Sequence, residues 1–247
     1  MEIMLKFKSN CVNMKSYVLI FIVIFLFVNI GNTYSQNDDT NNDQEFVLFA
    51  SFGIQFPEYS ELNDRLIENG YSKFGQINYS TSGGFYLCYP KSKLSILGNV
   101  SGFSQTITDQ NISTSFKSTG IGVSLGYTFF SNKKLQLIPY LGTEFSWLNL
   151  NIINDVSPNS TFINYLSGTT NQYEMSATNL LANIGIVSKK SFFIDEKSFN
   201  KLVIGIRTGY STPVLKTIWT VSETELNDGP IINTGGFYAG IIIGLEL

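Results

Sequence analysis

The chain has 247 residues, of which 14% are charged and 14% aromatic, and its 16 basic and 19 acidic residues give a net charge of −3. Nucleic-acid binding needs clustered Lys and Arg with a basic balance, so a nucleic-acid partner is excluded. The sequence has no histidine, and therefore lacks the commonest general base and the commonest nitrogen ligand of zinc. We expect no cofactor and no metal site.

The N-terminus has the layout of a secretory signal peptide. Lys15 precedes an apolar run from Val18 to Val28, which is shorter than the roughly 20 residues of a membrane-spanning helix. Small residues follow, so the sequence predicts a signal peptide over residues 1–35 with cleavage after Ser35. Met14 is an alternative start, and an uncleaved anchor helix is the competing interpretation. A polar stretch over residues 36–44 then predicts a flexible leader.

From residue 45 onward the apolar residues recur with a period of two, which is typical of β-strands. The stretch from Ser118 to Phe129 is the clearest example, because every second residue is large and apolar while the residues between them are small. Small side chains fit inside a narrow barrel, and the bulky face then meets lipid. The small face comprises Ser118, Gly120, Gly122, Ser124, Gly126 and Thr128, and the bulky face Ile121, Val123, Leu125, Tyr127 and Phe129.

Eight segments have this pattern, and most are long enough to cross a bilayer as tilted strands of roughly 9 to 11 residues. Their even number returns both ends of the sheet to one side of the membrane. The sequence therefore predicts an all-β fold, an eight-stranded antiparallel transmembrane β-barrel with up-and-down meander topology, over residues 45–247. The segments are 46–56, 81–89, 94–106, 115–130, 135–149, 173–188, 202–210 and 235–247.

The connections between these segments largely alternate in length, as they do in outer-membrane barrels. Short turns rich in lysine are expected at residues 90–93, 131–134 and 189–201, and three longer loops at 57–80, 150–172 and 211–234. The first long loop contains Leu62, Leu66 and Ile67 at helical spacing. A short helix is predicted there, either on the rim of the barrel or capping its mouth.

Two charged residues are predicted to point into the barrel. Glu144 and Arg207 alternate with apolar residues that face outward, and a charge facing lipid at mid-depth costs about 2 to 4 kcal/mol. We expect both in one interior hydrogen-bonded network with Glu174, Tyr140 and Tyr238. Such a network fixes a closed barrel or, alternatively, lines a gate or narrow conduction path.

One catalytic pattern occurs and is set aside. Gly122 to Gly126 reads GVSLG, the G-x-S-x-G pattern of a hydrolase nucleophile elbow. That motif needs a strand-turn-helix context and a histidine that activates the serine. Ser124 lies in the middle of a predicted strand of a chain without histidine, so no catalytic residue is assigned and the protein is expected not to be an enzyme.

The signal peptide, the eight period-two segments, the stretch IPYLGTEFSW (Ile138–Trp147) and the terminal FYAGIIIGLEL (Phe237–Leu247) resemble the small outer-membrane β-barrels of the OmpA/OmpX kind, particularly barrel domains common in Bacteroidota. The resemblance implies residence in the outer membrane, contact with its lipid and insertion by the barrel-assembly machinery.

Three functions are compatible with these patterns. The leading hypothesis is a non-enzymatic integral outer-membrane protein with an envelope structural or surface-contact role. The second is a narrow pore for small solutes or ions. A large aqueous channel is not expected, since eight strands enclose an interior that side chains fill. The third is an exported soluble, lipocalin-like binder of an apolar ligand.

Overall fold

The computed structural model describes residues 44–109, 111–132, 135–154, 172–193, 201–222, 224–226 and 229–247. The predicted signal peptide at 1–35 and all of the predicted leader except Gln44 lie outside these residues. Within the described part of the chain, no helix is both long and apolar enough to cross a membrane.

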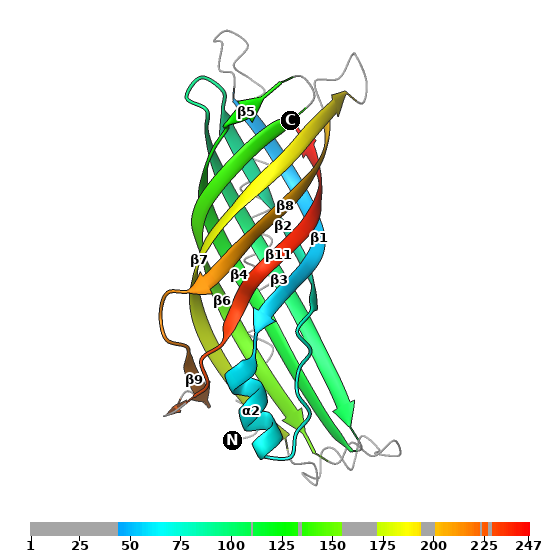
Figure 1. The fold of residues 1–247 in the computed structure, drawn as a ribbon, viewed down its shortest axis with the longest axis vertical. Helices are drawn as coiled ribbons and strands as arrows, with labels where there is room; N and C mark the ends of the chain where they lie inside the picture. Colours follow the sequence, from blue (N-terminus) through cyan, green and yellow to red (C-terminus); the bar gives the residue numbers. More distant parts are fainter. Residues whose placement is uncertain are drawn as a thin grey trace, which may run out of the picture. The chain divides into compact units, whose positions relative to one another are not determined.

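Eight long strands of the described residues form one antiparallel sheet that closes on itself (Figure 1). Strands consecutive in the chain pair with each other, and β11 returns to pair with β1, so the sheet has no long free edge. This arrangement confirms the predicted eight-stranded antiparallel barrel with up-and-down topology. The strands are β1 (Glu45–Glu58), β2 (Asn78–Tyr89), β3 (Leu94–Asp109), β4 (Ile112–Tyr127), β6 (Gln136–Ile153), β7 (Gln172–Phe193), β8 (Lys201–Pro213) and β11 (Asn233–Glu246).

The alternation of side chains between the two faces of the sheet is the one expected from the sequence. In β4, Val123 and Leu125 are 54% and 68% exposed, whereas Gly122 and Ser124, which alternate with them, are buried. In β11, Phe237 and Ile241 are likewise exposed on the outer face while Ile242 is buried inside. The barrel therefore carries its large apolar residues mainly outside, which is the reverse of a water-soluble barrel.

Four shorter elements complete the described fold: α2 (Ser60–Glu68), β5 (Phe130–Ser131), β9 (Ile218–Val221) and β10 (Thr224–Glu225). We call the end of the barrel that carries α2 and β9 the long-loop end, and the end that carries β5 the short-turn end; they lie at the bottom and top of Figure 1. The predicted helix is thus confirmed. Its Leu62 and Leu66 are buried against the barrel, so it caps the mouth.

One predicted turn begins later than expected. Residues 189–201 were expected to form a connection, but β7 continues to Phe193, and Lys189 points into the barrel with 1% of its surface exposed. Its ammonium lies 3.9 Å from a carboxylate oxygen of Glu45 and 3.6 Å from the sulfur of Cys88. The strand continues because its last residues pair with β8, from Lys189 with Gly205 to Phe193 with Lys201. The buried position supplies both a counter-charge and a hydrogen-bond acceptor for the lysine, as a buried charge requires.

Apolar side chains close the barrel interior near both ends. The mouth cluster, at the long-loop end, consists of inward-facing strand residues and residues from α2 and the loops: Tyr59, Leu62, Leu66, Phe74, Phe103, Phe116, Leu148, Leu150, Ile152, Ala177, Trp219 and Ile232. The turn-end cluster, nearer the short-turn end, comprises Val47, Phe49, Tyr86, Cys88, Leu97, Ile138, Tyr140, Val187, Val203 and Ile242.

Candidate functional site: a polar chamber inside the barrel

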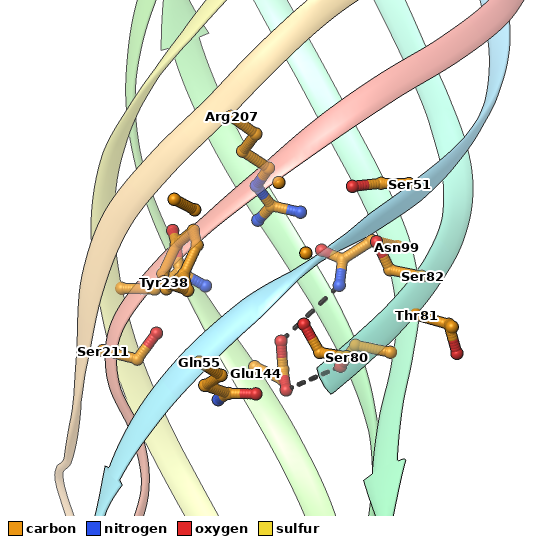
Figure 2. A pocket seen from close by; sticks show the side chains of 15 residues that line it. Ser51, Gln55, Ser80, Thr81, Ser82, Asn99, Glu144, Arg207, Ser211 and Tyr238 are labelled. Carbon is orange, nitrogen blue, oxygen red and sulfur yellow. Dashed lines mark hydrogen bonds between the residues drawn. The ribbon is translucent and has the colours of Figure 1, made fainter. Parts of the chain in front are cut away.

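Between the two clusters the barrel encloses a polar chamber (Figure 2). Its volume is about 60 Å³. A water molecule needs a cavity of roughly 10 to 15 Å³, so the chamber has room for several waters. Its lining includes one acidic residue, Glu144, and one basic residue, Arg207, and most of the other lining residues are small or uncharged polar: Ser51, Gln55, Ser80, Thr81, Ser82, Asn99, Ser101, Asn183 and Ser211.

Arg207 is the buried cation of the chamber, with 7% of its surface exposed. Its Nε donates a hydrogen bond of 2.8 Å to the Tyr140 hydroxyl. The guanidinium carbon lies 5.0 Å from the centre of the Tyr140 ring and 5.5 Å from that of Tyr238, within the range of cation–π attraction. The two tyrosine hydroxyls are also hydrogen-bonded to each other. Two aromatic rings therefore stabilise the charge, and no carboxylate among the described residues forms an ion pair with it.

Two glycines make room for these rings. Gly185 stands opposite Tyr140 in the β6–β7 register, and Gly209 stands opposite Tyr238 in the β8–β11 register. A Cβ atom at Gly185 would collide with the Tyr140 hydroxyl, and one at Gly209 would collide with the Tyr238 hydroxyl. Each tyrosine thus covers the glycine of the neighbouring strand, which is the close approach that only a residue without a side chain allows.

Glu144, on β6, is the acidic residue of the chamber. Its Oε1 accepts a hydrogen bond of 2.9 Å from Ser101 Oγ, and the Asn99 amide nitrogen lies 3.5 Å from Oε2. A Cβ at Gly120 would strike the carboxylate, so a small residue on β4 is needed beside it. Asn99 is 5% exposed, and its Oδ1 has no hydrogen-bond partner in the part of the chain that the structure describes, which makes it an acceptor for water in the chamber.

The structure brings together four of the five residues predicted for the interior network. Tyr140, Tyr238 and Arg207 are in direct contact, and Glu144 faces the same chamber (Figure 2). Within the described residues, Arg207 and Glu144 form no direct ion pair. The two charges therefore face each other across space that water can fill.

Glu174 does not belong to this group, which corrects the prediction. It lies on the outward-facing side of β7, is exposed, and accepts a hydrogen bond of 2.9 Å from Asn149 Nδ2. Even-numbered residues of this part of β7 face outward. The strand continues beyond the apolar belt, the outer surface that carries exposed residues such as Leu125, Leu141, Ile184 and Phe237, so a carboxylate meets water there without cost. The sequence reasoning missed Asn99 and Ser101, although both stand on the inward side of β3 and were detectable by their alternation with Val100 and Gly102.

The mouth cluster separates the chamber from the long-loop end. Tyr59, between β1 and α2, is 3% exposed and accepts a hydrogen bond of 2.7 Å from Asn78 Nδ2. Burial raises the pKa of Tyr59 above its ordinary value, and the hydrogen bond with Asn78 opposes part of that increase. Asn63 of α2 both donates to and accepts from the backbone of Phe74, at 3.1 and 2.8 Å. The helix is therefore tied to the loop that follows it.

Ser124, the serine of the G-x-S-x-G pattern, lies in the middle of a strand, as the sequence predicts. Ser124 is 2% exposed inside the barrel, and its Oγ donates a hydrogen bond of 3.2 Å to Asn183 Oδ1. The chain has no histidine that could activate it. In the described ranges, no group of three or more His, Cys, Asp or Glu side chains could hold a metal ion.

Together these features define a closed eight-stranded β-barrel with an apolar outer belt and a polar interior chamber that has an apolar cluster on either side. No protein-family model matches the sequence, and no curated protein matches it.

Solved structures with a similar fold come from outer-membrane proteins. A major outer membrane protein from Thermus thermophilus has a TM-score of 0.50 at 9% identity, covering 83% of this chain and 98% of that one. Ail, the attachment invasion locus protein of Yersinia pestis, has 0.41 at 12% identity, covering 82% and 96%. Neisserial surface protein A has 0.37 at 13% identity, covering 82% and 96%. These likenesses concern the fold.

Proposed function

We propose that the protein is a non-enzymatic integral outer-membrane β-barrel that serves an envelope structural or surface-contact role. The observation that carries this proposal is the outward apolar belt. Leu125, Leu141, Ile184 and Phe237 are each more than 60% exposed on the outer surface, while Arg207 is buried inside the barrel. A continuous apolar surface of this kind needs hydrocarbon around it.

Aromatic residues border the belt at both ends, as expected for the two membrane interfaces. Toward the long-loop end, Phe56, Phe237 and Tyr210 are neighbours on β1, β11 and β8, and Tyr210 and Phe237 pack with ring centres 4.8 Å apart. Toward the short-turn end, exposed Tyr127, Phe129, Phe130, Phe192 and Phe193 occupy the ends of strands and the turns between them.

The filled interior favours a function that is carried out by the outer surface and the long-loop end of the barrel. Apolar clusters stand on both sides of the small chamber, so the barrel has the filled interior of a membrane anchor. Insertion by the barrel-assembly machinery and a place among the barrel domains common in Bacteroidota remain predictions from the sequence.

Membrane insertion is the direct test. Protein refolded from urea with phospholipid vesicles is expected to float with them, to resist protease along the strands and to migrate faster on an unheated gel than after boiling. In cells it is expected in the detergent-extracted outer membrane. Recovery in the soluble fraction would contradict the proposal and favour the soluble, lipocalin-like binder, against which the exposed belt and the small polar chamber argue.

A narrow pore is the second candidate, and the charged chamber is the observation that favours it. Both apolar clusters argue against it, because they fill the interior on either side of the chamber. Planar-bilayer recording separates the two functions: an inserted barrel with no discrete conductance supports the anchor, whereas stable single-channel steps support the pore.

A further inference from the structure

The outer face of one side of the barrel changes character beyond Trp147, toward the long-loop end. There the outward positions of β3, β4, β6 and β7 are polar and mostly uncharged. Strand register places Lys117 opposite Asn149, and Asn149 opposite Ser176, in one row across three strands. We call this surface the polar sheet: Ser104, Thr106, Thr108, Ser113, Ser115, Lys117, Asn149, Asn151, Glu174, Ser176 and Thr178.

The polar sheet is held in a fixed shape. Its inward side carries Phe116, Leu148 and Leu150, which pack in the mouth cluster. On the outward side Asn149 Nδ2 donates to Glu174 at 2.9 Å, and Gln172 donates to Asn151 Oδ1 at 3.3 Å. Neighbouring strands are about 4.8 Å apart, so hydroxyl and amide groups stand in regular rows. A partner that binds them meets preorganised groups and loses less entropy on binding.

Trp147 lies where the apolar belt meets the polar sheet. It is 46% exposed, stands between Thr119 and Thr178 in the register, and packs edge-on against Phe145 with ring centres 4.9 Å apart. An aromatic face beside amides and hydroxyls suits a sugar ring, which presents C–H groups on its faces and hydroxyls at its edges.

The position of this surface selects the kind of saccharide. On the membrane side of Trp147 the outward residues of β6 include Phe145 and Leu141, which are 40% and 64% exposed. On the other side stand Asn149 and, on β4, the exposed cation Lys117. A molecule with acyl chains, a phosphate and sugars would meet matching groups along one continuous strip.

We infer that the Trp147 strip of the polar sheet binds the core saccharide of a membrane glycolipid, the sugars that extend beyond its acylated disaccharide, with a core sugar on Trp147, Asn149 and Ser176 and a headgroup phosphate near Lys117. This inference rests on the proposed function, because the strip meets a glycolipid only when the barrel is in a membrane.

Trp147 itself can report binding. The chain has two tryptophans, and Trp219 is 2% exposed, so acrylamide quenching acts mainly on Trp147. In phospholipid vesicles, lipopolysaccharide with its core saccharide is expected to protect Trp147 from quenching, whereas lipid A without the core protects it much less. The double variant N149A/S176A is expected to need about tenfold more lipopolysaccharide for the same protection, since it loses two hydrogen bonds.

The matched control is T208A/T212A, which removes two outward-facing hydroxyls from β8 and should bind as the wild type does. Equal protection by lipid A that lacks the core saccharide, or unchanged binding by N149A/S176A, would overturn the inference. Equal protection by the free core oligosaccharide would overturn it too, and would assign the strip to a soluble saccharide instead. Flotation with the vesicles distinguishes the two proposals: failure to insert contradicts the membrane barrel, whereas insertion without preference for the sugar contradicts only this inference.

Discussion

The hydroxyls of Tyr140 and Tyr238 are hydrogen-bonded to each other across 98 positions of sequence, and the Tyr140 hydroxyl also accepts a hydrogen bond from Arg207. The contact joins β6 to β11 through the inside of the barrel. A cross-link of this kind between non-neighbouring strands fixes the shape of the cross-section, which the hydrogen bonds of the ladder alone do not determine.

Replacing Arg207 by methionine is expected to lower the free energy of unfolding by about 2 to 4 kcal/mol, because both phenols lose their charged partner and Glu144 keeps its charge in the chamber. Urea unfolding of the barrel in detergent micelles, followed by gel mobility, measures the change. Lys216→Met, at an exposed loop position, is the matched control and should be neutral. Equal stability of the two variants would show that the network is not structural.

The glycines beneath the tyrosines should not tolerate a side chain. Gly209→Ala places a Cβ against the Tyr238 ring, and such overpacking typically costs about 1 to 3 kcal/mol. Gly83→Ala is the control, because its Cβ would meet only the Phe49 carbonyl oxygen at 3.6 Å. Refolding yields in vesicles compare the two variants, and equal yields would contradict the close approach of ring and glycine.

A charge on the outer belt should impair insertion. Leu141→Arg is expected to destabilise the inserted barrel by about 2 to 4 kcal/mol, whereas Thr178→Arg, beyond the belt, should cost about 0 to 1 kcal/mol. Equilibrium folding into phospholipid vesicles measures both. If the arginine at position 141 were as harmless as that at 178, the belt would not face hydrocarbon.

Shortening the two buried leucines of α2 should loosen the docking of this helix on the mouth of the barrel without opening a channel. In the variant L62A/L66A each lost leucine is expected to destabilise the docking of α2 by about 2 to 5 kcal/mol, so protease should cut near α2 while the strands stay protected. Conductance is expected to remain absent because the turn-end cluster still fills the barrel. Discrete current steps in this variant, absent from the wild type, would show that the mouth cluster alone closes a pore.

The sequence allowed the strands and their inward faces to be predicted wherever one face is small, as in β4, because a size difference at period two marks the side with least room. It did not reveal the two apolar clusters. Val47 and Phe49 are as apolar as their outward neighbours, so alternation cannot distinguish the faces there. Trp219 reaches the mouth cluster from the short strand β9, within a segment predicted as a loop, and this long-range contact is not encoded by any local pattern.

For the chamber, the inward direction of Arg207 and Glu144 was predictable, because a charged side chain in a membrane-spanning strand is tolerated on the inner face of the barrel and not on the face toward lipid. Glu174 was misplaced because the same rule was applied to a residue that lies outside the apolar belt. The inference needs the residue to lie among the outward apolar residues. The sequence placed the start of this strand at residue 173, next to its observed start at Gln172, but it did not show where along the strand the apolar outer surface ends.

The closing pair of strands constrains the order in which the fold can form. β1 pairs with β11 along nearly its whole length, from Val47 with Glu246 to Glu58 with Asn233. Until β11 is available, both β1 and β8 carry unpaired peptide groups, which hydrocarbon does not tolerate. We therefore expect insertion into a membrane to wait for the last strand, with the meeting of the two most distant strands of the barrel as the slow step. Losing β11 is then a failure of assembly for the entire barrel, even though the other seven strands keep their sequences.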